Sequence, residues 1–154
     1  MSDDDVGVID VLSAMTTVID KTMKKSNMQS PKGQDISMLL YGLQNMSSEG
    51  EVIRHLILVL VQMITECGDT FAAQAVGNAL YGLKGMSSEC AEVRDVMSAL
   101  VIKIRSCKED LKAQEVGNAL YGLQGMSSEC AEVRDVMSAL AIKIRSSKDR
   151  KRVV

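Results

Sequence analysis

A near-exact internal repeat constrains this chain of 154 residues more than any other feature. The segment GNALYGLQGMSSECAEVRDVMSAL at residues 117–140 occurs almost unchanged at residues 77–100, and equivalent residues stay 40 positions apart without gaps. A fixed period of this length is typical of arrays in which one supersecondary unit stacks on the next. The predicted units are residues 30–69 (repeat 1), 70–109 (repeat 2) and 110–149 (repeat 3).

Each repeat is predicted to be a pair of helices. Apolar residues recur at intervals of three and four in residues 93–104 and 133–144, which is the spacing of one helix face. Aromatic residues are scarce, and the abundant aliphatic residues suit close-packed helices better than sheets. We therefore predict an all-α fold, an α-solenoid of helical hairpins. Residues 1–29 should add an N-terminal capping helix, with one apolar face over residues 6–25, and a linker. Residues 150–154 should form a basic tail.

Turn and cap residues predict where these helices begin and end. The first helix of each repeat should follow a residue whose side-chain oxygen caps free N–H groups, and it should end at a residue that adopts the left-handed conformation. A serine pair should then cap the second helix. The predicted start caps are Ser30, Thr70 and Asp110, the predicted ends are Asn45, Gly85 and Gly125, and the serine pairs are Ser47/Ser48, Ser87/Ser88 and Ser127/Ser128.

Four glycines fall inside the predicted first helices, where each costs about 1 kcal/mol relative to alanine. We expect the close approach of a neighbouring helix to offset this cost. These glycines are Gly77, Gly82, Gly117 and Gly122.

A polar stripe on the first helices is the candidate ligand site. Its residues follow i, i+4, i+7 spacing, so stacked hairpins would place them side by side on the concave surface. Such a ladder could bind bases through amide hydrogen bonds and ring stacking. Alternatively, the asparagines bond between helices and the tyrosines pack between hairpins. The stripe comprises Gln74, Asn78, Tyr81, Gln114, Asn118 and Tyr121, and repeat 1 has Met38 in place of the asparagine.

Basic residues gather at the end of the second helices. They form a candidate phosphate-binding edge, or else they are charges that match the helix dipole on a solvated helix end. The residues are Lys103, Arg105, Lys143 and Arg145.

The sequence contains no pattern of an enzyme, so we expect no catalytic residue, no cofactor and no metal. The cysteines form two columns, Cys67/Cys107 and Cys90/Cys130, without a ligand-spaced His or second Cys, which favours buried thiols in a reducing compartment. His55, the single histidine, lies in a strongly apolar helix and is expected in a core or interface. The acidic start and the short apolar runs predict an intracellular chain without a signal peptide or membrane span, in the cytoplasm or an organelle.

Repeat 3 raises a packing problem, because it carries nearly the same residues as repeat 2 but no fourth repeat follows. Its far side, the distal face, should therefore be apolar and uncovered. We expect either self-association through this face or a longer natural chain. The net charge of −2 is modest, with residues 1–73 acidic (5 basic, 10 acidic) and residues 74–154 basic (13 basic, 10 acidic), so the balance is not that of a dedicated nucleic-acid binder.

The first-helix segments resemble the signature of octotricopeptide repeats. The segments are QDISMLLYGLQNM (34–46), QAVGNALYGLKGM (74–86) and QEVGNALYGLQGM (114–126). In the family signature a Gln and a small-Asn pair precede an apolar-apolar-aromatic core and a closing Gly. The resemblance implies an α-solenoid from a family associated mainly with RNA binding in organelle gene expression. It implies RNA contact for Gln74, Asn78, Gln114 and Asn118. The alternative function is a protein-interaction or self-association scaffold, which the acidic balance and the Met-rich apolar surface favour.

Overall fold

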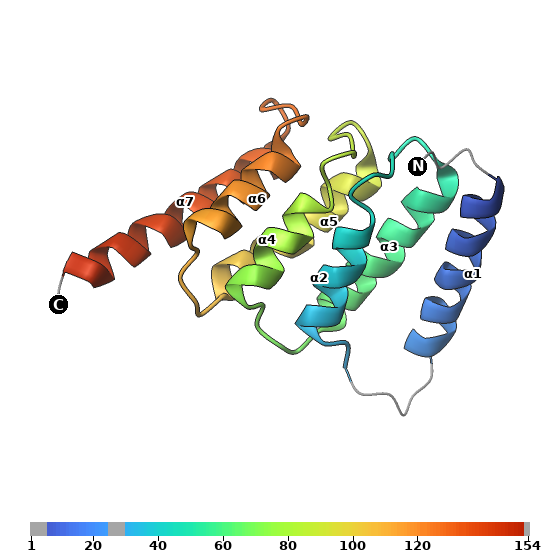
Figure 1. Cartoon of the computed structure of the whole chain (residues 1–154), viewed down its shortest axis with the longest axis horizontal. Coiled ribbons are helices and arrows are strands. Elements are labelled where there is room, and N and C mark those ends of the chain that lie inside the picture. Colours follow the sequence, from blue (N-terminus) through green and yellow to red (C-terminus); the bar gives the residue numbers. More distant parts are fainter. Residues whose placement is uncertain (1–5, 25–29, 153–154) are drawn as a thin grey trace.

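The chain is built from helices alone in the part that the structure, a computed structural model, describes: residues 6–24 and 30–152 (Figure 1). The helices are α1 (Val6–Met23), α2 (Gly33–Gly42), α3 (Glu51–Glu66), α4 (Ala73–Tyr81), α5 (Ala91–Ser106), α6 (Ala113–Leu123) and α7 (Ala131–Arg152). The predicted all-α class is confirmed. The predicted N-terminal segment 1–29 is represented by α1, and its residues 1–5 and 25–29 lie outside the described part.

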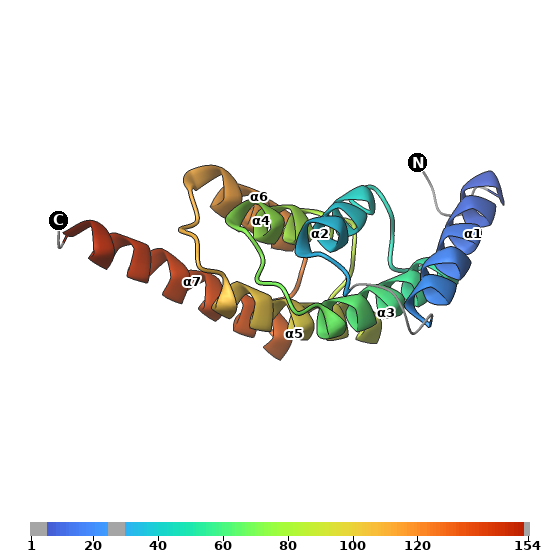
Figure 2. The ribbon, with the colours of Figure 1, turned by 90° about the horizontal axis from the view of Figure 1, so that it is seen from below.

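The helices form two layers (Figure 2). The first helices α2, α4 and α6 pack side by side in one layer, and α3, α5 and α7 pack in the same order in the other. Helix α1 packs on α3 and so belongs to the second layer. Helices 40 residues apart are therefore neighbours.

The core lies between the two layers, and the helical spacing predicted it well. In α5 the side chains of Val93, Val96, Met97, Leu100 and Ile104 are all buried. Burying one such aliphatic side chain contributes about 1.5–3 kcal/mol, so this buried helix face contributes strongly to stability.

The predicted caps of the first helices are wrong, because these helices begin later, at Gly33, Ala73 and Ala113. The residues before α2 and α4 are Lys32 and Ala72, which cap nothing through their side chains. Ser30 instead donates to the carbonyl of Glu66 and accepts from the N–H of Gly68, at the end of α3. The start of α4 is capped from the loop between α5 and α6, where the carboxylate of Glu109 accepts from the N–H of Ala73.

The predicted ends of the first helices are also wrong. No described residue, glycine included, has a positive φ, so the left-handed closure does not occur there. The first helices end two to four residues earlier than predicted, at Gly42, Tyr81 and Leu123. Tight turns follow, in which the N–H groups of Leu83 and Lys84 bond three residues back. These bonds satisfy the last carbonyls that a left-handed residue would otherwise satisfy.

The prediction that the serine pairs cap the second helices is wrong, because α3 and α5 begin after Gly50 and Cys90 and no side chain caps them. The second serine of the first two pairs instead bonds to the next serine pair along the chain. The hydroxyl of Ser48 accepts from the N–H of Ser87 at 2.9 Å, and that of Ser88 accepts from the N–H of Ser127 at 3.0 Å. Ser48 and Ser88 are buried, whereas the equivalent Ser128 is exposed at the end of the series.

Replacing Ser88 with alanine should lower the free energy of unfolding by about 1 kcal/mol, because the N–H of Ser127 loses its acceptor. The matched change Ser128→Ala should leave stability within about 0.5 kcal/mol of the parent, as surface changes usually do. Urea unfolding followed by circular dichroism measures both. Equal effects of the two changes would contradict a role for this hydroxyl between repeats.

Helix α7 continues beyond the predicted end of repeat 3. Phe71 and Leu111 are buried where the chain turns back towards the first-helix layer. The equivalent position 151 carries a lysine, which offers no apolar anchor for such a turn. Residues 150–152 therefore belong to α7 rather than to a separate tail, and residues 153–154 lie outside the described part.

The expected close approach at the glycines is confirmed for three of the four. A Cβ added to Gly77 would lie 3.1 Å from Cα of Glu115. At Gly82 and Gly122 it would lie 1.9 Å from the carbonyl oxygens of Leu40 and Leu80. The expectation is wrong for Gly117, which faces open space.

Candidate ligand-binding groove

Three tyrosines stack into a ladder along the first-helix layer. The ring centroids of Tyr41 and Tyr81 are 5.4 Å apart at an interplanar angle of 26°, and those of Tyr81 and Tyr121 are 5.4 Å apart at 17°. Nζ of Lys84 lies 5.1 Å from the Tyr81 centroid and 5.6 Å from that of Tyr121, within cation–π range. The ring faces between neighbouring tyrosines are thus covered by protein.

The predicted stripe converges on one groove beside this ladder, which we call the amide groove. It has a volume of about 420 Å³. The lining residues are Met38, Tyr41, Gln74, Asn78, Tyr81, Gln114 and Asn118. Five of the six predicted stripe residues therefore line it, and the sixth, Tyr121, stacks on Tyr81 beside it.

The four amides of this groove are free to bind a ligand. In the described part of the chain no hydrogen bond joins the side chains of Gln74, Asn78, Gln114 or Asn118 to other protein groups. The alternative that the asparagines bond between helices is therefore wrong. Each amide offers two donors and one acceptor oxygen. A half-buried amide such as Asn78 is stabilised when a ligand or water occupies these sites.

A second groove of about 540 Å³ adjoins the amide groove and extends its polar surface towards repeat 1. The two share Met38, Gln74 and Asn78, and the second adds Lys32 and Thr70. The polar surface therefore continues from α6 towards the start of α2.

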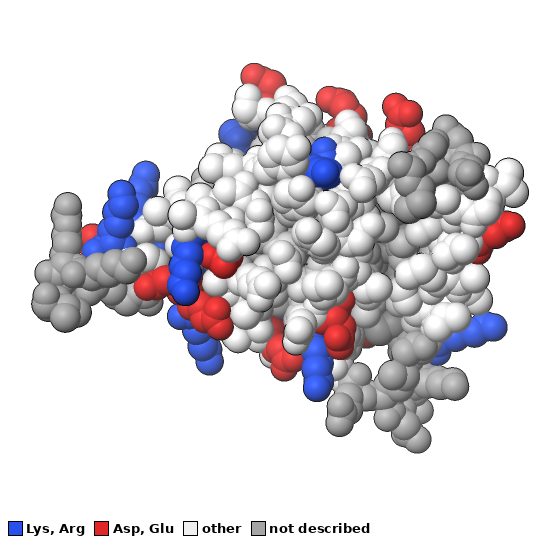
Figure 3. All heavy atoms as spheres, in the orientation of Figure 1, with Lys and Arg blue, Asp and Glu red and all other residues white. Residues whose placement is uncertain are grey.

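Few charges lie over the first-helix layer. In Figure 3, which faces this layer, charged side chains lie mainly at the rims, and uncharged atoms cover most of α2, α4 and α6. The surface of the amide groove thus offers hydrogen-bonding groups and little charge.

The predicted basic edge does not act as a set of four free cations. Nζ of Lys103 donates to the carbonyls of Cys67 and Asp69, and Nζ of Lys143 donates to the carbonyl of Cys107 and is buried. Each lysine therefore links its second helix to the loop of the preceding repeat. Arg105 and Arg145 remain exposed. The apolar neighbours of Lys103, Leu100 and Ile104, were a signal that its stem would be buried.

Three arginines that the sequence analysis did not single out have a structural role. The Nη1 atoms of Arg54, Arg94 and Arg134 each donate to two backbone carbonyls of the turn before their helix. The arginine stands at the same position in all three repeats, which was the signal available in the sequence.

The cysteine columns differ in their surroundings. Cys67 and Cys107 are buried as predicted, whereas Cys90 and Cys130 are only half-buried, so the prediction is wrong for this second column. Sγ of Cys90 donates to the carboxylate of Glu92 at 3.0 Å, and Cys130 makes the equivalent bond to Glu132 at 3.1 Å. Burial first, and then the bond to Glu92, raise the pKa of the Cys90 thiol. The same kind of bond lowers the pKa of the Glu92 and Glu132 carboxyls.

Alkylation of Cys90 by iodoacetamide near pH 8 should be slower in the folded chain than in the urea-unfolded chain, because a raised pKa leaves less of the reactive thiolate. Glu92→Gln should speed the reaction, since the carboxylate that disfavours the thiolate is lost. Mass spectrometry of the peptide containing Cys90 measures both rates. A folded rate equal to the unfolded one would contradict this assignment.

His55 was predicted in a core or an interface; it is exposed rather than in the core, and it lies on α3 beside α1. It lines a polar groove between α1 and α3 together with Thr16, Asp20 and Glu51. No group of three or more His, Cys, Asp or Glu residues able to hold a metal ion occurs in residues 6–24 and 30–152. Within these same ranges, no helix combines the length and apolarity needed to cross a bilayer.

Comparison of the chain with protein-family models, with curated proteins and with solved structures found no match.

Proposed function

We propose that the chain is a non-enzymatic α-solenoid binding module with a 40-residue repeat. The side-by-side packing of helices one period apart supports this architecture. The repeated backbone contacts of Leu40 with Gly82 and of Leu80 with Gly122 support it as well. In such an array the first helices offer one continuous surface to which each repeat contributes equivalent side chains.

The ligand proposed for the amide groove is single-stranded RNA. The observation that carries this proposal is the set of four amides, from two successive repeats, that line one groove and have no protein partner among the described residues. Asparagine and glutamine can donate to and accept from the edges of unpaired bases. The resemblance of the first helices to octotricopeptide repeats points to the same ligand.

The tyrosine ladder determines how bases would be read. Because Tyr41, Tyr81 and Tyr121 stack on one another, a base cannot insert between them without breaking the ladder. Recognition would therefore rest on hydrogen bonds from the amides, with Tyr81 serving to position the helices. Lys32 lines the second groove and Lys84 lies over the Tyr81 ring. If these two lysines contact phosphates, RNA affinity should fall only shallowly with salt, with a slope of about −1.4.

Fluorescence anisotropy with a pool of labelled single-stranded RNAs, at low and at physiological salt, tests this proposal. Asn78→Ala and Asn118→Ala should each weaken binding about tenfold, the effect of about 1.4 kcal/mol. Asn45→Ala is the matched control, because Asn45 is exposed in the turn after α2, outside the amide groove. Absence of binding even at low salt, or equal weakening by all three changes, would contradict RNA as the ligand.

The second candidate function is a self-association scaffold, which one comparison within the chain favours. Leu80 in α4 is 0 % exposed and its equivalent Leu120 in α6 is 44 % exposed; Met97 in α5 is 0 % exposed and its equivalent Met137 in α7 is 41 % exposed. The distal face of repeat 3 thus exposes the surface that repeat 2 buries against repeat 3. Light scattering over a range of concentrations tests whether a second copy covers this face, and a strict monomer would contradict it.

A further inference from the structure

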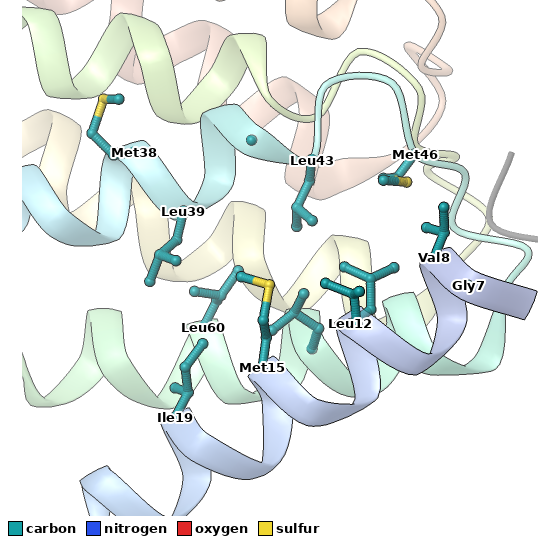
Figure 4. Close-up of a pocket in the computed structure, with 13 residues that line it drawn as sticks. Gly7, Val8, Leu12, Met15, Ile19, Met38, Leu39, Leu43, Met46 and Leu60 are labelled. Carbon is teal, nitrogen blue, oxygen red and sulfur yellow. The ribbon is translucent and has the colours of Figure 1, made fainter. Parts of the chain in front are cut away.

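The opposite end of the array carries an apolar groove, which we call the N-terminal groove (Figure 4). It has a volume of about 580 Å³ and lies between α1, α2 and α3. Val8, Leu12, Met15 and Ile19 of α1 line one side, and Leu39, Leu43 and Met46 of repeat 1 the other. All thirteen lining residues are apolar or glycine, so the groove suits an apolar helix face.

Gly42, which lines this groove, marks a place where a neighbouring helix could pack on α2. Gly42 is the equivalent of Gly82 and Gly122, each of which receives the backbone carbonyl of a leucine from the preceding first helix. Gly42 lines the groove and has nothing within 4 Å of an added Cβ. The position of a preceding first helix is therefore open beside α2.

Helix α1 takes the place of a preceding second helix, so beside repeat 1 only the place of a first helix is open. Its segment VIDVLSAM (8–15) matches VRDVMSAL (93–100 and 133–140) at five of eight positions, and Leu and Met exchange places at two more. It also contacts α3, which in turn contacts α5. Val11 is 60 % exposed, whereas its equivalent in α5, Val96, is 0 % exposed beneath a first helix. Helix α1 thus occupies the place of a second helix whose first helix is missing.

The distal face of repeat 3 provides the matching surface. Leu120 is the equivalent of Leu40 and Leu80, whose carbonyls lie against the glycines of the next repeat. It is the exposed member of the three. Met137 is the equivalent of Leu12, which is buried where α1 packs on α3. The exposed Ser128 is the equivalent of Ser48 and Ser88, which bind the N–H of the following repeat.

We propose that copies of the chain associate head to tail, with repeat 3 of one copy continuing into repeat 1 of the next. Helix α6 enters the N-terminal groove and places the Leu120 carbonyl on Gly42, and α7 takes the place of α1 on α3. Helix α1 therefore competes within its own chain with α7 of a second copy, and acts as a removable cap. The proposal rests on the self-association scaffold and adds to it the receiving surface and the competing helix. Heterologous contacts of this kind extend without closing unless something stops them.

Two blocked variants of the full chain test the proposal. Gly42→Val fills the receiving position, where an added Cβ meets nothing within 4 Å. Leu120→Asp places a charge on the donating face, at a side chain that is 44 % exposed. Sedimentation velocity of the parent should show species that grow with concentration, and each variant alone should remain monomeric. An equimolar mixture should form heterodimers and nothing larger, because each variant keeps one intact face.

A third variant tests the role of α1. Leu12→Ala weakens the packing of α1 on α3, so α7 of a second copy should win more often, and the association constant should rise about tenfold or more. Circular dichroism checks that each variant remains folded. A parent and a Leu12→Ala variant that both stay monomeric at about 1 mM, where even contacts of about −4 kcal/mol show, would overturn the scaffold and the head-to-tail proposal together. Association that Leu120→Asp abolishes but Gly42→Val leaves intact would keep the scaffold and overturn only the head-to-tail arrangement.

Discussion

Replacing Gly82 with alanine should lower the free energy of unfolding by about 3 kcal/mol, the upper part of the usual range for overpacking. The added Cβ would lie 1.9 Å from the carbonyl oxygen of Leu40, and the atom it meets is backbone, which cannot turn aside as a flexible side chain can. Helices α2 and α4 would have to separate. Urea unfolding of a dilute sample, where the chain is monomeric, measures the loss.

The same substitution at Gly42 is the matched control, because Gly42 has nothing within 4 Å of an added Cβ. Gly42→Ala should leave stability unchanged or raise it by up to about 1 kcal/mol, since alanine restricts the unfolded chain and favours a helix. A similar loss at both glycines would show that the close contact between α2 and α4 is not the cause.

Truncating Leu80 to alanine should cost about 3 kcal/mol, within the range observed when a buried leucine is removed. Leu80 is fully buried between α4 and the neighbouring helices. The identical change at Leu120 should cost less, about 1 kcal/mol, because that side chain is 44 % exposed and loses fewer contacts. Chemical unfolding of both variants at one low concentration measures the difference.

The comparison of Leu80 with Leu120 also tests the register of the repeats. The two leucines share their sequence neighbours, so any difference in effect comes from the presence or absence of a following repeat. Equal destabilisation would mean that something covers Leu120 as fully as α6 covers Leu80. Raising the protein concentration should increase the effect of Leu120→Ala if a second copy provides that cover.

The sequence predicted the helices and their buried faces because both follow from periodicity. The run of apolar residues in α5 has one helical spacing, and burial followed it. The convergence of the amides on one groove was predicted from the same periodicity applied across repeats. Helical periodicity shows which residues of one helix lie on the same face, and the 40-residue repeat shows which residues of successive hairpins lie side by side.

The boundaries and several polar roles could not be predicted, because they depend on partners in another repeat. Ser30 has the right chemistry for a helix cap, but its hydroxyl bonds to the end of α3. Lys103 was expected to be a solvent-exposed charge at a helix end, but its ammonium group donates to carbonyls 34 and 36 residues earlier in the chain. Hydrogen bonds to another hairpin compete with hydrogen bonds to nearby backbone groups, and the packing of the hairpins determines which of the two forms. The exposure of His55 could not be predicted either, because it depends on the polar groove that α1 and α3 form together.

The tyrosine ladder makes the chain its own optical probe. The sequence has three tyrosines and no tryptophan, so near-ultraviolet signals come almost entirely from rings that stack at 5.4 Å spacing. Transitions of rings held this close couple, and the coupling depends on the alignment of α2, α4 and α6. Near-ultraviolet circular dichroism therefore follows the register of the first-helix layer without any label. A ligand that enters the amide groove beside Tyr41 and Tyr81 would change the same spectrum, so one measurement reports both binding and the order of the array.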